Sequence, residues 1–278
     1  MTWIGHSTIL LQHRGINILT DPMFSRRASP VQWAGPARIT EPALRLEELP
    51  PIHAVVISHD HFDHLDVRSI KALGSDPMYF VPLALKRWFV KRGIAEERIV
   101  EMDWWDTETL TVGEQSVEIT ATPSQHFSGR SLTGRNATLW AAWSLRWDGF
   151  HAWFGGDTGY NDRQFRAVPE RLGPVDLGMI PIGAYEPRRM MGTVHVNPAE
   201  AVMIHDDIGA RASLGMHWGT FVLAAEGVLT PLADLAAALP DRADPESEFV
   251  TFAVGESRRY VDGALRARRV SEDRDELP

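Results

Sequence analysis

Short apolar runs separated by turn residues predict a chain built mainly from strands and short helices. Residues 3–12 and 15–19 are apolar or alternate around a glycine turn, which predicts an opening β-hairpin. Residues 22–51 contain six prolines and little periodicity, so we expect a long ordered loop, and such loops inside compact domains are usually functional. The β-branched run at 54–57 predicts a buried strand, and the pattern at 66–73 predicts a helix.

The rest of the chain alternates between strands and helices, which predicts two mixed sheets with helices outside. We expect helices at 83–92, 162–172, 197–207 and 232–239, and strands at 78–81, 99–102, 108–112, 117–121, 138–147, 151–154, 175–180, 212–216, 249–252 and 257–260. No stretch has the composition of a linker between domains. The pattern therefore predicts one α/β domain over residues 1–265 and a charged tail at 266–278 that we expect to be disordered.

A cluster of histidine and aspartate follows the strand predicted at 54–57. Residues 58–64 read Ser-His-Asp-His-Phe-Asp-His, which places three imidazoles and two carboxylates at the carboxyl end of a buried strand. Packing does not require them, because crowded His and Asp side chains repel one another once charged and are costly to bury. A bound cation removes the conflict, and zinc, or less selectively manganese or iron, prefers these ligand types. A polar loop is the alternative, but it leaves four of these side chains unexplained.

Three later strands also end in potential ligands. His126, Asp157 and His217 each follow a predicted strand. Taken alone, each histidine is more often a hydrogen-bonded loop residue, and an aspartate between glycines is more often a turn residue. Four strand ends that carry potential ligands in one chain favour a shared metal site.

The composition limits the ligand types, partners and location that the protein can have. The 278 residues include no cysteine, so any metal site must use His, Asp and Glu. The net charge of -9 argues against a nucleic-acid partner. The N-terminus lacks a secretory signal pattern and no window reaches the ~18 apolar residues of a spanning helix, which predicts a cytoplasmic protein, peripheral to a membrane at most. Ten tryptophans are a high count, and a few of them suit contact with a lipid because indole favours membrane interfaces.

Several segments resemble the metallo-β-lactamase superfamily, whose two-metal members carry a His-x-His-x-Asp-His motif, then a later His, an Asp and a final His. From Trp3 to about Tyr260, the chain is most similar to the branch of N-acylphosphatidylethanolamine-hydrolysing phospholipase D and its bacterial relatives. The segments IPIGAYEPR at 180–188 and HWGTF at 217–221 are more specific than the metal motif. The resemblance implies an αββα sandwich of four layers.

The resemblance also implies two bound zinc ions, with manganese or iron as alternatives. The implied ligands are His59, His61 and His126 for one ion, Asp63, His64 and His217 for the other, and Asp157 as the bridge. Two ions ~3.5 to 4 Å apart can hold a hydroxide and neutralise charge on a phosphoryl group under attack. Asp63 is a candidate acceptor of the water proton, and His195 is a candidate to orient substrate or protonate the leaving alkoxide. The alternative for His195 is a loop histidine bonded to backbone.

Other candidate residues for substrate binding and for orienting the metal ligands have weaker support. Arg188 suits bidentate contact with a substrate phosphate, although a surface charge is the alternative. Tyr185 and Gln125 lie in matching segments and are further candidates for substrate binding. His6 and Asp21 end the opening strands and are candidates to orient ligand imidazoles, or to make ordinary hydrogen bonds at a turn and a strand end.

The leading hypothesis is a phosphodiesterase of phospholipase D type that hydrolyses N-acylphosphatidylethanolamine to N-acylethanolamine and phosphatidate. A second hypothesis keeps the site but takes a soluble phosphoester or a lactone. A non-catalytic metal-binding protein is a third, which a set of seven ligands disfavours. A nuclease is disfavoured by the acidic balance. Peripheral membrane contact and a homodimer are further expectations.

Overall fold

The first β-sheet contains six strands in chain order. Its strands are β1 Thr2–Gly5, β2 Thr8–His13, β3 Ile16–Thr20, β4 Ala54–Val56, β5 Met78–Pro82 and β6 Ile99–Met102. Neighbours from β1 to β3 are antiparallel, and those from β3 to β6 are parallel. All residues of β4 are buried, as expected for an apolar strand covered on both faces. The computed structural model describes residues 1–131 and 133–267.

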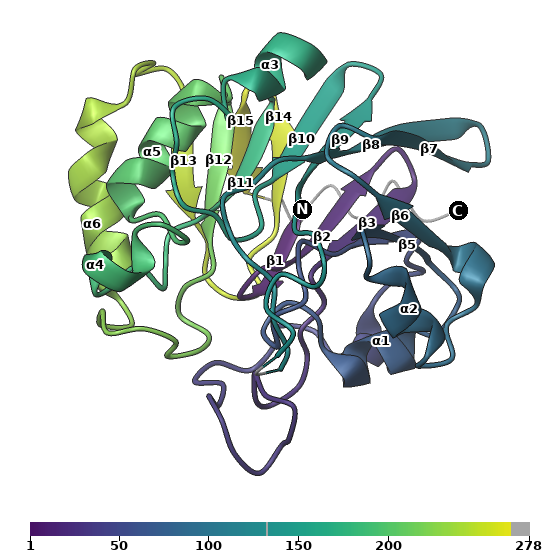
Figure 1. Cartoon of the computed structure of the whole chain (residues 1–278). Helices are drawn as coiled ribbons and strands as arrows, with labels where there is room; N and C mark the ends of the chain where they lie inside the picture. The colour runs from purple at the N-terminus through teal and green to yellow at the C-terminus, as the bar shows by residue number, and fades with distance from the viewer. Residues whose placement is uncertain (132, 268–278) are drawn as a thin grey trace.

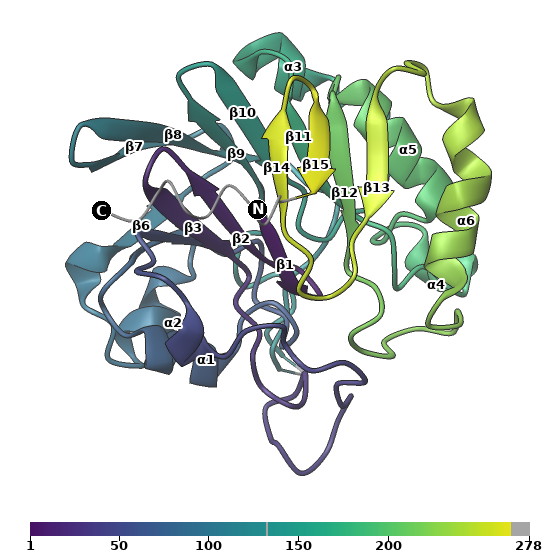
Figure 2. The same ribbon diagram turned by 180° about the vertical axis from the view of Figure 1, so that it is seen from behind.

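The second sheet contains seven strands, again ordered as in the chain. Its strands are β7 Thr107–Val112, β8 Gln115–Thr122, β9 Ala142–Trp147, β10 Phe150–Phe154, β11 Leu177–Pro181, β12 Ala212–Met216 and β13 Glu248–Thr251. Neighbours from β7 to β10 are antiparallel, and those from β10 to β13 are parallel. The hairpin of β14 Arg258–Val261 and β15 Ala264–Ala267 lies beside β1 (Figure 2), where the amide of Trp3 donates to the carbonyl of Glu256 at 3.2 Å.

Helices cover the outer face of each sheet (Figure 1). They are α1 Val67–Leu73, α2 Lys86–Val90, α3 Ala167–Leu172, α4 Arg188–Met191, α5 Pro198–Asp207 and α6 Thr230–Ala238, with 3-10 turns at Leu46–Glu48, Glu96–Arg98 and Leu239–Asp241. Ile70 of α1 and Phe89 of α2 pack on the first sheet, whereas α3, α5 and α6 pack on the second. The two sheets bury a third cluster, which includes Trp3, Trp143 and Phe154, between them. The expected αββα sandwich is confirmed.

Several boundaries differ from the sequence prediction. The predicted opening hairpin is three strands, because the chain turns at His6 between β1 and β2 with a positive φ of 54°. Helices α2 and α3 begin later than predicted, and the short helix α4 was not predicted. The predicted tail also begins too early, because residues 266–267 belong to β15. Residues 268–278 lie outside the described residues.

A long loop separates β3 from β4 and projects from one end of the sandwich (Figure 1). Apart from the 3-10 turn Leu46–Glu48, residues 22–51 form no helix or strand, as predicted. The loop is tied down at its base, because the amide and hydroxyl of Ser25 both donate to the carboxylate of Asp66, the N-cap of α1. None of the helices in the described residues has the length and apolar character needed to cross a membrane.

Candidate metal centre

The carboxyl ends of four strands meet at one edge of the sandwich and bring all seven predicted ligands together. β4 leads into the motif at residues 58–64, β8 leads to His126, β10 to Asp157 and β12 to His217. Each of these four strands has a neighbour on both sides in its sheet, so the side chains that follow them are held by well-packed backbone. The predicted convergence of strand ends is therefore found in the structure.

Three histidines form one half of the centre. Nε2 of His59 lies 2.8 Å, and Nε2 of His126 lies 3.2 Å, from Nδ1 of His61. Burial lowers the pKa of His59 and of His126 well below the ordinary histidine value, and it also lowers the pKa of His61. The three imidazoles are therefore held neutral. Their ring nitrogens face one another, and a cation bound by all three nitrogens explains this arrangement better than hydrogen bonds between the rings do.

Asp63, His64 and His217 form the other half. Nε2 of His64 lies 3.2 Å from Nε2 of His217, and Oδ2 of Asp63 lies 3.3 Å and 3.4 Å from these two nitrogens. Burial lowers the pKa of His217, but the carboxylates of Asp157 and Asp63 together outweigh it and raise this pKa to about 9. The pKa of His64 is raised well above its usual value for the same reason. The carboxylates therefore draw positive charge to this point, as a cation site requires.

Asp157 lies between the two halves. Its Oδ2 is 3.2 Å from Nε2 of His64 and 3.8 Å from Nε2 of His126, and its Oδ1 is 3.1 Å from Nε2 of His217. Oδ1 is buried and accepts no hydrogen bond from the residues that the structure describes. Both oxygens lie close to the half that contains His64 and His217, and Oδ2 also faces the three-histidine half, which suits the predicted bridging position. The nitrogen and oxygen donor set fits a zinc-type ion.

The predicted orienting residues contact the ligands from outside. Oδ2 of Asp21 lies 2.6 Å from Nδ1 of His64, and the amide of Ser58 donates to Oδ1 of Asp21 at 2.7 Å. Nε2 of His6 lies 2.9 Å from Oδ2 of Asp63. Burial lowers the pKa of His6 to about 3, so its imidazole is neutral. Partners of this kind fix the tautomer and direction of ligand side chains.

Sequence reasoning missed two further contacts that hold predicted ligands in place. The hydroxyl of Ser58 lies 2.9 Å from Nδ1 of His59, and Nδ1 of His126 lies 2.8 Å from the carbonyl oxygen of Val194. A serine next to a predicted ligand is only a weak sequence signal of such a contact. The contact of His126 with a backbone carbonyl 68 residues away has no signal in the sequence.

Arg130 holds the ligand loop in place. Its Nη1 donates to the carbonyl oxygens of Asp60 at 2.6 Å and of Leu65 at 2.8 Å, and its guanidinium lies 4.1 Å from the ring centre of Phe62. The amide of Gly129 donates to the side chain of Asp60 at 2.7 Å. The remaining carboxylate of the motif, which the sequence left without a role, thus fastens the ligand loop to the segment after His126.

His195 lies at the edge of the centre, and its predicted role in orienting or protonating substrate stays a prediction. Its Nδ1 is 3.9 Å from Oδ2 of Asp157, and its ring centre is 5.1 Å from that of His126. Nδ1 is buried without a hydrogen bond from the described residues. Burial lowers the pKa of His195 to about 4, so the imidazole is neutral at pH 7.

The other substrate-binding candidates are occupied by protein partners. Nη2 of Arg188 lies 2.7 Å from a carboxylate oxygen of Glu200, and its Nη1 donates to the carbonyl of His195 at 2.8 Å. The hydroxyl of Tyr185 donates to Asp234 at 2.5 Å. The third candidate is likewise paired: the side-chain amide of Gln125 donates to the carbonyl of Thr193, and its side-chain carbonyl accepts from Asn161. Substrate contact by these three side chains stays a prediction.

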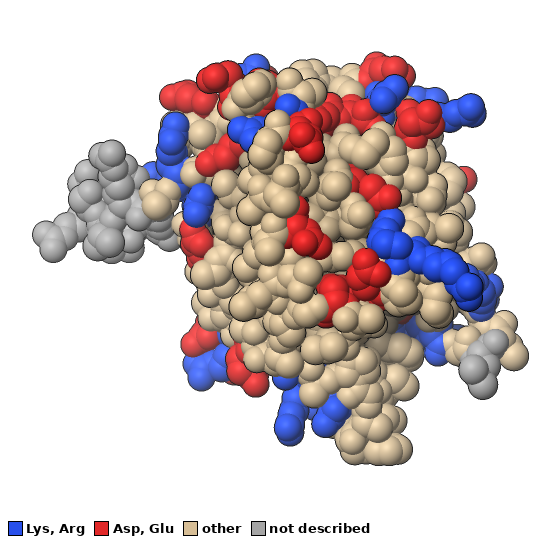
Figure 3. Space-filling model, turned by 90° about the vertical axis from the view of Figure 1, so that its left-hand side faces the viewer, with Lys and Arg blue, Asp and Glu red and all other residues tan. Residues whose placement is uncertain are grey.

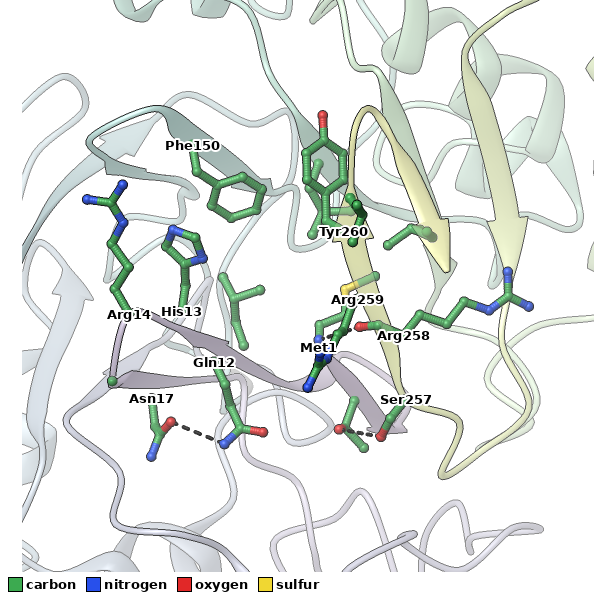
Figure 4. Close-up of a pocket in the computed structure, with 16 residues that line it drawn as sticks. Met1, Gln12, His13, Arg14, Asn17, Phe150, Ser257, Arg258, Arg259 and Tyr260 are labelled. Atoms are coloured by element: carbon green, nitrogen blue, oxygen red, sulfur yellow. Dashed lines mark hydrogen bonds between the residues drawn. The ribbon is translucent and has the colours of Figure 1, made fainter. Parts of the chain in front are cut away.

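A separate cavity of about 570 Å³ lies away from the metal centre, at the far end of β2 from His6. His13, Phe150 and Tyr260 form part of its wall, and Arg14 lies at its border (Figure 4). None of the seven predicted ligands lines it. The cavity therefore takes no part in the centre described above.

Comparison with known proteins defines the class. Residues 16–218 match the family model described as Beta-lactamase superfamily domain. The chain belongs to this superfamily, and its fold and its cluster of His and Asp are those of a metal-dependent hydrolase. The resemblance predicted from the sequence is confirmed.

Three relatives show how similar the chain is to individual proteins. The chain is 39% identical over 263 residues to N-acyl-phosphatidylethanolamine-hydrolyzing phospholipase D 1 of Caenorhabditis elegans, covering 92% of this chain and 74% of the relative. It is 38% identical over 237 residues to the mitochondrial enzyme of the same kind from Saccharomyces cerevisiae, covering 83% and 49%. It is also 29% identical over 224 residues to a UPF0173 metal-dependent hydrolase of Pyrobaculum neutrophilum, covering 80% and 84%.

Solved structures share the fold at low sequence identity. The metallo hydrolase Igni18 from Ignicoccus hospitalis superposes with a TM-score of 0.66 at 18% identity, covering 92% of this chain and 95% of that one. An isothiocyanate hydrolase from Delia radicum gut bacteria superposes with a TM-score of 0.69 at 17% identity, covering 93% and 98%. These matches establish the architecture only.

Proposed function

We propose that the protein is a phosphodiesterase of phospholipase D type, which hydrolyses N-acylphosphatidylethanolamine to N-acylethanolamine and phosphatidate. The observation that carries the proposal is the 39% identity, over 92% of the chain, to a relative named for this activity. The converging His and Asp side chains support it, because a phosphodiester resists attack until its negative charge is neutralised.

Two divalent cations, most simply zinc, fit the donor atoms. The residues that would hold them are His59, His61 and His126 on one side, Asp63, His64 and His217 on the other, and Asp157 between them. When bound, such ions would polarise the phosphoryl oxygens and acidify a water molecule. Manganese or iron would be accepted by the same donor atoms with less selectivity.

Two side chains have further roles in the proposed reaction. Histidine neighbours hold the pKa of Asp63 well below the ordinary aspartate value against the effect of burial, so this carboxylate is ionised at neutral pH and supplies charge rather than storing a proton. His195 is neutral, and its position beside Asp157 suits a hydrogen bond to a substrate oxygen. Orientation of substrate is therefore the favoured role for His195, ahead of proton donation.

A soluble phosphoester or a lactone is the second candidate substrate. The relatives also include a protein named only as a metal-dependent hydrolase, and this similarity extends over 80% of the chain. Both substrates would use the same donor atoms, because either reaction develops negative charge on an oxygen next to the site.

Product analysis tests the proposal. Zinc-reconstituted protein is incubated with N-acylphosphatidylethanolamine in mixed micelles, and the products are measured by mass spectrometry with Asp157→Asn as the blank. We expect N-acylethanolamine and phosphatidate from the wild type only. If the wild type releases neither product but hydrolyses a water-soluble phosphodiester or a lactone, the lipid proposal is wrong and the second candidate replaces it.

A further inference from the structure

The cavity of about 570 Å³ that lies away from the metal centre has the size of a small-molecule site. Its walls come from the turn between β2 and β3 in the first sheet, from the starts of β10 and β11 in the second sheet, and from the β14–β15 hairpin. We call it the seam cavity, because both sheets contribute to it. Its apolar surface includes three buried leucines, Leu11, Leu177 and Leu265.

One part of the seam cavity is aromatic. The ring centre of Phe150 lies 4.7 Å from that of His13, with 36° between the ring planes, and 5.3 Å from that of Tyr260. Burial, and then the charge of Arg14, lower the pKa of His13, so this ring is uncharged at neutral pH. The hydroxyl of Tyr260 donates to Asp176 at 3.0 Å, which leaves the ring as its contribution to the cavity. Three neighbouring rings offer a stacking surface to a flat ligand.

The charged side chains of the seam cavity are of one sign. Among the described residues that line it there are three arginines and neither aspartate nor glutamate, although the protein has a net charge of -9. On the face of the molecule that carries α6, by contrast, acidic and basic side chains are interspersed (Figure 3). An anionic group is therefore the complementary charge for a ligand of this cavity.

Arg14 is held at the border of the seam cavity by a tight turn. β2 ends at His13 and β3 begins at Ile16, so Arg14 and Gly15 form a two-residue hairpin loop, in which both have a positive φ, of 47° and 75°. Figure 4 shows the side chains of Arg14 and His13 side by side, both pointing toward Phe150. A cation is thus fixed next to the aromatic surface.

Arg14 is also the arginine best suited to pair with a ligand. Its Nη1 lies 3.8 Å from a carboxylate oxygen of Asp148, whose side chain is 97% exposed, and an ion pair in such contact with water contributes little. Arg258 is less suited, because its Nε lies 2.7 Å from a carboxylate oxygen of Glu256. The contact with Asp148 is therefore easily exchanged for a contact with a bound anion.

We propose that the seam cavity binds a small molecule in which a flat aromatic ring carries an anionic group, the chemistry shared by aromatic carboxylates and nucleotides. The ring stacks on the aromatic surface of His13, Phe150 and Tyr260, and the anionic group pairs with Arg14. The inference goes beyond the proposed function and does not depend on it, because none of the seven predicted metal ligands lines the cavity.

Calorimetric titration of the zinc-loaded full chain tests the proposal. The probe is 2-naphthoate, in which a flat double ring carries one carboxylate. The matched ligands are 2-naphthol, which has the ring without the charge at neutral pH, and inorganic phosphate, which has charge without a ring. We expect each of these two to bind at least about tenfold more weakly than 2-naphthoate. Adenosine monophosphate separates the two sources, because tighter binding than 2-naphthoate indicates a nucleotide and weaker binding indicates an aromatic carboxylate.

Two charge reversals locate the binding site. Arg14→Glu should weaken the binding of 2-naphthoate by at least about tenfold, because a charged hydrogen bond is replaced by repulsion. Arg163→Glu makes the same change at an exposed arginine outside the cavity and should bind as the wild type does. Melting temperatures without ligand check that both variants are folded, and Arg14→Gln replaces Arg14→Glu if the latter melts lower. The affinity of the wild type should also fall with added salt.

Three results would overturn the proposal. The first is binding that is lost in Asp157→Asn but kept in Arg14→Glu, which would place 2-naphthoate on the metal centre. The second is equal binding by Arg14→Glu and Arg163→Glu. The third is the absence of binding by the wild type, in which case a dimer that only Arg14→Glu loses would assign the cavity to a second copy of the chain.

Discussion

The carboxylate of Asp21 lies 2.6 Å from Nδ1 of His64, and it accepts a second hydrogen bond from the amide of Ser58. Asp21 directly follows β3, and both of its partners follow β4, the parallel neighbour of β3. The register of two adjacent strands therefore sets the direction of a predicted ligand. Nδ1 of His64 is engaged by Asp21, so Nε2 is the nitrogen that faces the centre.

Substitution of Asp21 should weaken metal binding. We expect Asp21→Asn to lower zinc affinity by about 10- to 100-fold, because loss of an outer carboxylate partner makes the imidazole a poorer and less fixed ligand. Competition with a chromophoric chelator measures the affinity. Asp148→Asn, at an aspartate whose side chain is 97% exposed, is the matched control. Equal affinities in the two variants would contradict the role of Asp21.

Removal of metal should lower the stability of the fold. A ligand that binds only the folded state contributes about 2.7 kcal/mol when it is present at 100 times its dissociation constant. We therefore expect a chelator to lower the melting temperature and zinc to restore it. Elemental analysis should find two ions in the wild type and about one in His126→Ala, because the second half of the centre keeps its own ligands. An unchanged melting temperature after chelation would argue against a bound metal.

Arg130 should be important for stability as well as activity. Arg130→Met leaves the carbonyl oxygens of Asp60 and Leu65 without their donor, so we expect the free energy of unfolding to fall by about 2 to 4 kcal/mol. Urea denaturation measures this change. Arg135→Met is the control, since Arg135 lies over the ring of Phe127 in the same segment. Equal losses in both variants would show that the contacts with the ligand loop are unimportant.

Acid should destabilise the fold partly through His205, which lies away from the centre. Its Nδ1 and Nε2 lie 2.7 Å and 2.8 Å from the hydroxyls of Ser213 and Ser247. Burial, with help from Arg242 and against Asp244, lowers the pKa of His205 from 6.5 to about 4. The unfolded chain therefore binds more protons between these values, so the contribution is complete above pH 6.5 and is lost as the pH falls toward 4.

The variant His205→Asn isolates that contribution. Between pH 6.5 and 4.5 we expect the free energy of unfolding to fall less steeply with acid in the variant than in the wild type, by about 1.4 kcal/mol per pH unit. Denaturation curves at several pH values measure both slopes. Parallel slopes would mean that His205 is not held neutral by the fold.

Substitutions of Arg188 and of Glu200 should have similar effects on kcat/KM. Both terminal nitrogens of Arg188 contact protein acceptors, and one of these acceptors is the carbonyl of His195. We expect Arg188→Gln and Glu200→Gln to lower kcat/KM by similar factors of about 10, because either change releases the segment that positions His195. A much larger rise in KM for Arg188→Gln than for Glu200→Gln would instead support direct contact with a substrate phosphate.

The sequence predicts the layers, and the meeting of His and Asp side chains at one edge of the sandwich, for a physical reason. Apolar β-branched runs mark buried strands, and polar His and Asp at their ends are too costly to occur there without a purpose. Arg130 was not predicted, because its bonds join segments that are 65 to 70 residues apart and leave no local pattern. β15 was missed although Asp262 and Gly263 form a turn with positive φ, since its charged neighbours suggested a frayed end.

The division of the predicted ligands between the sheets has a consequence for how the chain could be cut. Residues 59–64 follow β4 of the first sheet, whose last strand ends at residue 102. His126, Asp157 and His217 all follow strands of the second sheet, which begins at residue 107. A nick between β6 and β7 would leave two fragments, each with an incomplete set of donor atoms. Reassembly of these fragments should then depend on divalent metal, so that the two fragments would combine only when the metal is added.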